Sequence, residues 1–378
     1  MQPLNILHVF RAPVGGLFRH VLDLTHEQIA RGHRVGLIAD QSTGGPRAEQ
    51  VLAELEPSLA LGLTRVPMRR HLSPSDTRVL GHVMGRVAKT QADVVHGHGA
   101  KGGAYARLVF GNKRAVRAYT PHGGSLLFGH DTLAGKFYLT TERVLMLRGD
   151  LFLFESAYSG NIFRNKIGNP RGLVRIVHNG VSRKEFEPVT SRPDASDLVF
   201  LGELRPVKGI DVLIEAIAQM HGHGRRVTAT LVGDGPERKA LQHQVEHHGL
   251  EAAVRFMPAM PAREAMTQGR IMVAPSRAES LPYVVLEAAA AGKPLITTRV
   301  GGIPEIYGSL SNTLVPPIDV QALAASIGEA IGRPDTMVEN TRKLREQVLA
   351  SFSVDSMVDG VLSSYQTALE ILHRNGRR

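Results

Sequence analysis

Short apolar runs alternate with amphipathic stretches of helical length through most of the chain, and this alternation is the strongest constraint on its fold. Residues 6–10 form a mostly apolar run of the kind found in buried strands. Gly15 and Gly16 follow, residues 17–31 place apolar side chains on one helical face, and residues 35–39 are apolar again. A strand, a covering helix and a second strand of this kind predict two parallel strands.

The same order recurs to the end of the chain. The expected strands are residues 94–96, 117–120, 151–155, 174–178, 198–201, 227–232, 254–256, 271–273 and 295–298. The expected later helices are residues 210–220, 236–247, 282–291, 320–331 and 354–373. Strands alternating with helices in both halves predict two doubly wound α/β domains of Rossmann-like type.

A polar stretch containing proline and serine, residues 187–194, is typical of a linker. We therefore expect an N-terminal domain over residues 1–187, a C-terminal domain over 188–353 and a terminal helix over 354–378. A length of 378 residues agrees with two domains.

Positive charge is concentrated in the first half of the chain. Up to Glu185 there are 25 basic and 13 acidic residues, a net charge of +12, whereas the remainder has 20 basic and 22 acidic residues. An anionic membrane surface would be attracted to such a domain. With no tryptophan and 5% aromatic residues, platforms that stack on bases are disfavoured, and no nucleic-acid partner is expected.

Composition also limits the kinds of site the protein can contain and where in the cell it is expected. Cysteine is absent, which excludes disulfides, thiolate zinc sites and a catalytic cysteine. The N-terminus shows no basic-then-apolar signal segment, and the sequence has no run of 18 apolar residues. We expect a cytoplasmic protein, peripheral at most to the inner face of a membrane.

Ligands of open parallel sheets bind beyond the carboxyl ends of the strands, so residues that follow strands are the functional candidates. The strongest group follows the strand at 271–273. Glu279 lies in a loop there, Pro282 stands where a first helical residue is expected, and Glu287 comes two turns into that helix. Carboxylates can accept hydrogen bonds from neighbouring sugar hydroxyls, and amides at a helix start can hold a phosphate.

Two cations form the second group, after the strand at 198–201. Arg205 and Lys208 flank a turn that opens a helix, an arrangement suited to a diphosphate. In the first half, Gly15 and Gly16 would let a ligand approach the backbone, and His122 follows a strand where it could contact a sugar hydroxyl or a developing charge.

Other motifs point away from metal-dependent chemistry. His96 and His98 stand two residues apart without an evident third ligand nearby, so a strand-end loop is favoured over a metal site. There is no P-loop motif, no Gly-x-Ser-x-Gly elbow and no Asp-x-Asp pair.

Taken together, these motifs resemble glycosyltransferase family 4, the retaining enzymes of GT-B fold. Glu279 and Glu287 match the family's two glutamates separated by seven residues, and Arg205 and Lys208 match its Arg and Lys-Gly pair. Gly15 and Gly16 match its glycine loop, and residues 178–181 match the segment that enters the linker. Glu203 departs from the Gly-Arg that many members carry there, without changing the spacing of Arg205 and Lys208.

The resemblance implies a GT-B fold of two facing Rossmann-like domains with a cleft between them, an acceptor on the N-terminal side and a nucleotide sugar on the C-terminal side. Arg205, Lys208, Glu279 and His122 would be catalytic. The donor would be bound by the following residues: Gly15, Gly16, Arg205, Lys208, Glu279, Ser280, Leu281, Pro282 and Glu287.

The implied reaction is transfer of a hexose-type sugar, from a UDP or GDP donor, to a glycan or lipid-linked acceptor with retention of configuration. Cell-surface polysaccharide or lipopolysaccharide synthesis is the expected setting. Neither a metal nor another cofactor is expected. Two alternatives stay open: a nucleotide-sugar epimerase of the same fold, and a nucleotide- or polyanion-binding protein.

Overall fold

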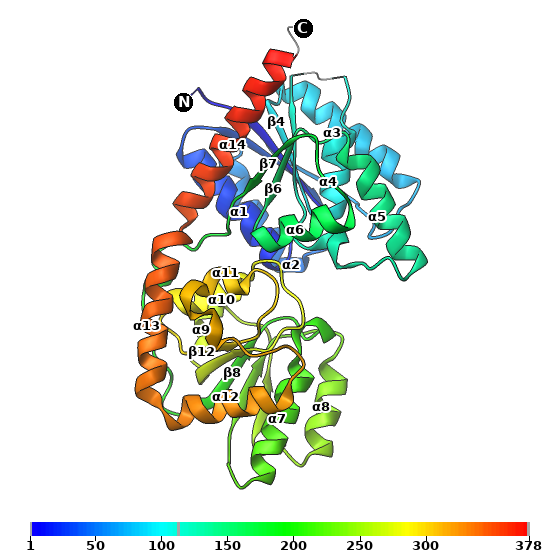
Figure 1. Ribbon diagram of the computed structural model, residues 1–378. Helices are drawn as coiled ribbons and strands as arrows, with labels where there is room; N and C mark the ends of the chain where they lie inside the picture. Colours follow the sequence, from blue (N-terminus) through cyan, green and yellow to red (C-terminus); the bar gives the residue numbers. More distant parts are fainter. Residues whose placement is uncertain (1, 112–113, 376–378) are drawn as a thin grey trace. The chain divides into compact units, whose positions relative to one another are not determined.

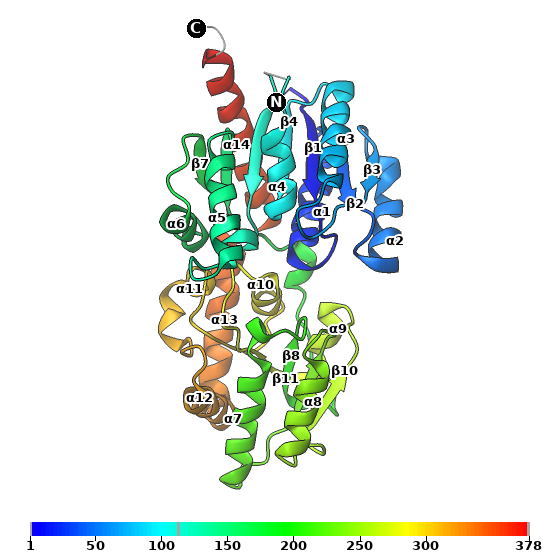
Figure 2. The same cartoon turned by 90° about the vertical axis from the view of Figure 1, so that its right-hand side faces the viewer.

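The computed structural model describes residues 2–111 and 114–375, which fold as two compact α/β units. Unit 1 takes the chain as far as Asn179 and resumes at Val354, and unit 2 consists of Gly180–Ser353. Figures 1 and 2 show that each unit is a parallel sheet with helices on both of its faces. The expectation of two Rossmann-like domains is confirmed.

Unit 1 contains a seven-stranded parallel sheet in the order β3-β2-β1-β4-β5-β6-β7. Its strands are β1 (Asn5–Phe10), β2 (Arg34–Asp40), β3 (Leu63–Val66), β4 (Val94–His98), β5 (Val116–Thr120), β6 (Leu151–Phe154) and β7 (Leu173–Ile176). The strand order reverses between β1 and β4, which are neighbours in the sheet (Figure 2). Crevices at such a reversal are where ligands of these folds bind.

The helices of unit 1 are α1 (Gly15–Ala30), α2 (Gly45–Leu55), α3 (Ser75–Thr90), α4 (Gly99–Leu108), α5 (Leu133–Met146), α6 (Ala157–Lys166) and α14 (Val354–Asn375). Alternate residues of β1 face opposite sides of the sheet, as the two-residue period of a strand requires. Ile6 packs with α1 and α14, whereas Leu7 and Val9 pack with α3 and α4. Figure 1 shows α14, in red, beside α1 on the sheet of unit 1.

Unit 2 contains a five-stranded parallel sheet in the order β10-β9-β8-β11-β12. Its strands are β8 (Ser196–Leu201), β9 (Ala229–Val232), β10 (Val254–Met257), β11 (Gly269–Ala274) and β12 (Leu295–Thr297). Its helices are α7 (Ile210–Gly222), α8 (Arg238–His247), α9 (Ala262–Met266), α10 (Tyr283–Ala290), α11 (Ile303–Tyr307), α12 (Val320–Gly332) and α13 (Pro334–Ser351). Here the order reverses between β8 and β11.

The boundary between the units falls before Gly180 and not after residue 187, where the sequence predicts it. The intervening residues are tied to unit 2 by hydrogen bonds to their backbone atoms. Val181 N donates to Phe352 O at 2.8 Å, and Arg345 Nη2 donates to Phe186 O at 2.7 Å. Polar composition at 187–194 therefore marks an exposed segment of unit 2. The final helix α14 is grouped with unit 1, and the last three residues of the predicted tail, 376–378, lie outside the described part of the chain.

Candidate active site

The predicted donor residues of unit 2 follow β8 and β11, the two neighbouring strands at which the order of the sheet reverses. Both strands run in the same direction, so the loops that follow them leave the sheet at the same edge. The topology therefore brings together residues that are about 70 positions apart in the sequence.

The loop after β8 is held against the end of β11 by a glycine. Gly209 has a φ of +65°, and a Cβ at this position would lie 2.1 Å from the carbonyl oxygen of Pro275. A side chain here would need both a left-handed backbone and a shift of the neighbouring chain. The preceding residue is Lys208, so this close approach brings the lysine to the β11 loop.

Lys208 and Glu279 form a direct ion pair. The Lys208 Nζ lies 2.6 Å from Glu279 Oε1, and the same oxygen accepts from Ser276 Oγ at 2.7 Å. The two side chains are 25% and 13% exposed, so the pair is reachable from solvent without being fully hydrated. A cation and a carboxylate held at this edge can bind a phosphate and a sugar hydroxyl, respectively.

A second ion pair joins the β11 loop to the first turn of α7, the helix that follows the Lys208 loop. Arg277 Nη2 lies 2.6 Å from Asp211 Oδ2, and the Arg277 Nη1 lies 2.8 Å from Asp211 Oδ1. Burial acts to raise the pKa of Asp211, but the hydrogen bonds and charge of Arg277 outweigh it and hold the pKa below its ordinary value. This bidentate pair fixes the β11 loop against the start of α7, and the sequence did not indicate it.

Arg205 lies on the same loop as Lys208 but does not join the ion pair. Its guanidinium is 45% exposed, and its Nη1 lies 3.6 Å from Glu203 Oε2. The Lys208 N–H donates to Arg205 O at 2.9 Å, closing the turn that the sequence predicts between the two cations. Lys208 is thus paired directly with Glu279, whereas the Arg205 side chain, three residues earlier on the same loop, is largely in solvent.

The remaining predicted donor residues lie at the start of α10. Pro282 caps this helix, and Tyr283 is its first residue, so the helix begins one position later than predicted. Leu281 is buried, and Ser280 O accepts from the Gly302 N–H at 2.7 Å. Glu287 lies in the second turn and is partly buried.

In unit 1, Gly15 and Gly16 are exposed at the start of α1. Gly15 has a φ of +62°, and no atom of the described residues lies within 4 Å of the position that a Cβ would take. The close approach of a ligand to this backbone, which the sequence predicts, is compatible with the open space. The role of both glycines stays a prediction.

His122 directly follows the β5–Pro121 segment and has a φ of +50°, a left-handed conformation that is uncommon for residues other than glycine. Both of its ring nitrogens are engaged within unit 1. Nδ1 lies 2.5 Å from Glu155 Oε1, and Nε2 lies 3.1 Å from His98 Nδ1. A hydrogen bond from this ring to a sugar would have to replace one of these contacts, and the predicted catalytic role stays a prediction.

His122 is the outermost member of a histidine cluster that the sequence did not reveal. The cluster consists of His8, His20, His96, His98 and His122, whose rings lie close to one another around β1 and β4. His96 and His98 are the pair noted in the sequence, and both are buried in β4 instead of lining a loop. Burial lowers the pKa of His8 to about 4.

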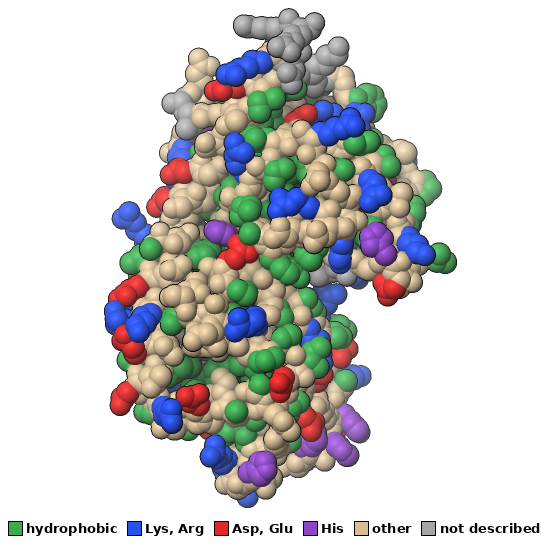
Figure 3. All heavy atoms as spheres, viewed as in Figure 1, with side chains coloured by type: hydrophobic (Ala, Val, Ile, Leu, Met, Phe, Trp, Pro, Cys, Tyr) green, Lys and Arg blue, Asp and Glu red, His purple; other side chains and the backbone are tan. Residues whose placement is uncertain are grey.

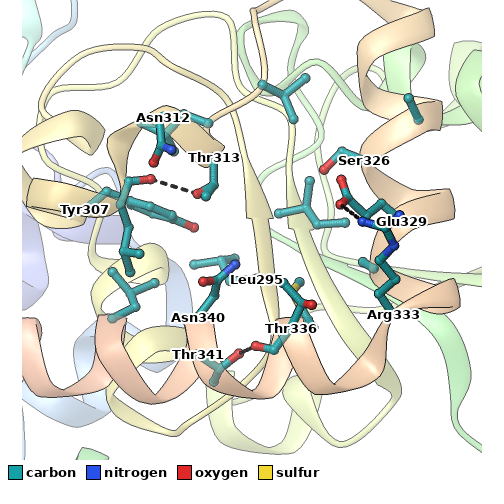
Figure 4. A pocket seen from close by; sticks show the side chains of 18 of the residues that line it. Leu295, Tyr307, Asn312, Thr313, Ser326, Glu329, Arg333, Thr336, Asn340 and Thr341 are labelled. Carbon is teal, nitrogen blue, oxygen red and sulfur yellow. Dashed lines mark hydrogen bonds and ion pairs between the residues drawn. The ribbon is translucent and has the colours of Figure 1, made fainter.

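A pocket of about 600 Å³ lies elsewhere in unit 2, between β12, α12 and α13. Figure 4 shows the side chains of Tyr307, Asn312 and Asn340 around it, with the Glu329–Arg333 ion pair at one side. None of the predicted donor residues lines it. This pocket is therefore distinct from the candidate site.

The basic excess of the first half does not produce a single patch on the face shown in Figure 3. There, Lys and Arg side chains stand among acidic and uncharged ones. Within the described residues, no helix has the length and apolar character needed to cross a bilayer.

Two family models match successive parts of the chain. The model described as "Glycosyltransferase Family 4" matches residues 14–185, and the model described as "Glycosyl transferases group 1" matches residues 195–333. The matches cover most of unit 1 and most of unit 2, respectively.

Individual proteins are similar over most of their length. The putative colanic acid biosynthesis glycosyltransferase WcaL of Escherichia coli is 27% identical, over 80% of this chain and 77% of that protein. The GPI3 subunit of phosphatidylinositol N-acetylglucosaminyltransferase of Saccharomyces cerevisiae is 24% identical, over 85% and 73%. Among solved structures, Anabaena Alr3699/HepE, in complex with UDP and glucose, superposes with a TM-score of 0.79 at 19% identity, over 96% and 99% of the two chains.

The fold, the arrangement of the β8 and β11 loops and these matches agree with the resemblance that the motifs suggest. The chain is a glycosyltransferase of the family 4 type and has the two Rossmann-like domains of the GT-B fold.

Proposed function

We propose that the protein transfers a hexose from a nucleoside-diphosphate sugar, with UDP or GDP as the leaving group, to a glycan or lipid-linked acceptor. The observation that carries this proposal is the contact between Lys208 Nζ and Glu279 Oε1 at the strand-order reversal of unit 2. In this contact a cation and a carboxylate that could accept hydrogen bonds from hydroxyls lie together at the sheet edge where such folds bind nucleotides.

The chemistry of the leaving group explains the cations. As the glycosidic bond breaks, negative charge grows on the diphosphate, and positive groups already in place lower the barrier because they need no reorganisation. When the donor binds, before the glycosidic bond breaks, Lys208 would turn from Glu279 to the diphosphate, and Arg205, which is half in solvent, would join it. Glu279 would then accept hydrogen bonds from the hexose, and Glu287 from the ribose.

The relatives support the substrate class. One similar structure holds UDP and glucose, and the names of the two similar proteins give colanic acid biosynthesis and a phosphatidylinositol N-acetylglucosaminyltransferase. A surface polysaccharide, lipopolysaccharide or glycolipid is the corresponding acceptor here. Since Arg205 and Lys208 supply positive charge, we propose that the diphosphate needs no metal. The resemblance to family 4 supports the further proposal that the sugar is transferred with retention.

A donor panel tests this function. We expect one or two nucleotide sugars to be hydrolysed slowly without acceptor, with release of the nucleoside diphosphate, and added Mg²⁺ or Mn²⁺ to leave the rate unchanged. Glu279→Ala should lower that rate by about 10²-fold because the sugar loses its orientation.

Glu246→Ala, which removes an exposed carboxylate from α8 in the same unit, is the matched control and should behave like wild type. Conversion of a nucleotide sugar without diphosphate release would identify an epimerase instead. Anomeric configuration in the product, read by NMR, decides between retention and inversion.

We also propose that unit 1 docks on an anionic membrane through α5. Leu133, Phe137 and Val144 are 86%, 52% and 59% exposed, and their spacing of four and seven residues places them on one side of the helix. Lys136 and Arg143 are exposed on the same helix. Apolar side chains flanked by cations are typical of helices that lie in a membrane interface.

Vesicle sedimentation tests the docking. Lys136→Ala with Arg143→Ala should weaken binding to phosphatidylglycerol-containing vesicles by about 30-fold, since each basic residue near such a surface contributes about 1 kcal/mol. Arg78→Ala with Lys89→Ala removes the same charge from exposed positions on α3 and is the control. Equal losses in both double variants would show that net charge, and not α5, determines binding.

A further inference from the structure

The histidine cluster contains a continuous chain of hydrogen-bonding groups that runs through unit 1 from Glu155 to Gln28. His122 Nδ1 contacts Glu155 Oε1 at 2.5 Å, and His122 Nε2 contacts His98 Nδ1 at 3.1 Å. His98 Nε2 contacts His8 Nδ1 at 2.9 Å, and His8 Nε2 contacts Gln28 Oε1 at 2.9 Å. All six ring nitrogens of the three histidines are therefore engaged.

The four contacts in this series of hydrogen-bonding groups can be compared with the number of N–H protons that its histidines supply. With Gln28 Oε1 as the acceptor at one end and the Glu155 carboxylate at the other, the four contacts need four N–H protons, whereas three neutral imidazoles supply three. The Gln28 Nε2 atom is buried without a hydrogen-bond partner among the described residues, so the reversed amide, whose nitrogen would donate to His8, is the arrangement that competes with this one. The His122 proton is drawn to the Glu155 carboxylate, and the His8 proton to Gln28 Oε1. The remaining proton is on His98 Nε2, which donates it in the hydrogen bond to His8 Nδ1. Two lone pairs then face each other, on His98 Nδ1 and His122 Nε2.

A third imidazole lies beside those two lone pairs. One ring nitrogen from each of His20, His98 and His122 falls within a group whose members all lie within 4.8 Å of one another. His20 Nδ1 is engaged by Asn179 Oδ1 at 2.9 Å, so its lone pair is on Nε2. His20 and His98 are buried, and His122 is almost so.

We propose that His20, His98 and His122 bind a divalent transition-metal ion, Zn²⁺ in particular, in unit 1. A metal ion at this point would accept both of the facing lone pairs, which otherwise repel each other. The negative charge of Glu155 would offset part of the charge of the ion. Tetrahedral zinc with Zn–N bonds of about 2.0–2.1 Å needs ligand nitrogens about 3.3 Å apart. The His98 and His122 nitrogens, at 3.1 Å, already approach this spacing.

The surroundings of the three rings match those of histidine metal ligands. Such ligands usually donate their second ring N–H to a carboxylate, an amide or another acceptor, which orients the ring. His122 has Glu155, His20 has Asn179 and His98 has His8 in this role.

A second triplet, His8, His96 and His98, is equally close but less suitable. His96 already contacts Tyr365 Oη at 2.7 Å and Thr120 Oγ1 at 2.8 Å, and among the described residues no carboxylate is bonded to any of these three rings. Imidazole ligands suit zinc, copper and nickel rather than calcium or magnesium. The ion would link α1, β4 and the loop that carries His122, which makes it a structural element of unit 1.

The test is a Zn²⁺ titration of the chelator-treated full chain against a competing chelator, without any sugar donor. His243 and His247 are exposed and four residues apart on α8, where they could bind zinc at the surface. All variants therefore carry His243→Gln and His247→Gln. In this background we expect one zinc per chain, and a visible cobalt spectrum of a nitrogen-ligated site when Co²⁺ replaces it.

The variants separate ligands from bystanders. His20→Gln, His98→Gln and His122→Gln should each abolish binding, and Glu155→Gln should weaken it by about 10–100-fold, the usual effect of losing an orienting partner. His26→Gln, which changes an exposed histidine on α1, should bind as the background does. Should His98→Gln fail to fold, the His20 and Glu155 variants still decide.

The proposal is overturned if the background binds no zinc, or if His20→Gln and His122→Gln bind it as tightly as the background. In that event the four hydrogen bonds between Glu155 and Gln28 form without a metal, because the Gln28 amide is reversed and its nitrogen donates to His8. Because no donor is present, failure here would leave the proposed transferase reaction untouched.

Discussion

Lys208→Ala is expected to lower kcat for sugar transfer or donor hydrolysis by about 10²–10³-fold, with a much smaller change in KM. The loss has this size because a preoriented group facing charge that develops in the transition state typically contributes that much. The lysine is already held at the β11 loop by Glu279, 2.6 Å away, and by the turn at Gly209. Initial rates over a range of donor concentrations provide the measurement.

Lys239→Ala is the matched control, because this lysine is exposed on α8 in the same unit and has no predicted part in donor binding. It should retain wild-type kinetics. A Lys208→Ala enzyme within about threefold of wild type would contradict the assignment of the leaving-group cation, whatever the control shows.

Arg107→Ala is expected to destabilise unit 1 by about 3–5 kcal/mol, because it leaves a buried carboxylate without its counter-charge. The guanidinium is fully buried on α4, with Nη1 2.8 Å from Glu142 Oε2 and its centre 3.8 Å from the Tyr119 ring centroid. Glu142 Oε1 in turn accepts from Tyr119 Oη and Ser125 Oγ, each at 2.9 Å. The network therefore joins α4, α5, β5 and the segment that follows His122.

Native-state hydrogen exchange of the β4 and β5 amides measures this loss, since it reports the opening of unit 1 by itself. The double variant Arg107→Met with Glu142→Gln should recover most of it. Methionine fills part of the volume without a charge, and glutamine still accepts from Tyr119 and Ser125. A loss below about 0.5 kcal/mol in Arg107→Ala would show that the ion pair contributes no more than an ordinary surface contact.

Helices and strands with a clear apolar period were predictable from the sequence. The run at 6–10 is β1, and the stretch at 210–220 lies within α7. By contrast, α13 was missed because only Leu344 and Val348 among its 18 residues are buried. So narrow an apolar stripe produces little periodicity, and such a helix depends on its contacts with the rest of unit 2.

The candidate donor residues were predictable as members of strand-end loops, but their contacts were not. Lys208 and Glu279 are 71 residues apart, and their ion pair depends on β8 and β11 being neighbours. Strand order cannot be read from local pattern, because it is decided by how helices pack across the sheet. The buried Arg107–Glu142 pair was missed for the same reason.

The histidine cluster carried a signal that could have been used. His96 and His98 are two residues apart in a strand, so their side chains share one face, and His8 interrupts the first apolar strand. Polar rings inside buried strands need partners. What the sequence could not show is that β1 pairs with β4, or that His20 and His122 approach from a helix and a loop.

A crystal structure of the protein with a nucleoside diphosphate would test the central claim most directly. We expect the diphosphate within hydrogen-bonding distance of Lys208 and Arg205, with Glu279 released from the lysine and Glu287 at the ribose hydroxyls. A nucleotide bound in unit 2 away from the β8 and β11 loops, with the Lys208–Glu279 contact intact, would contradict it.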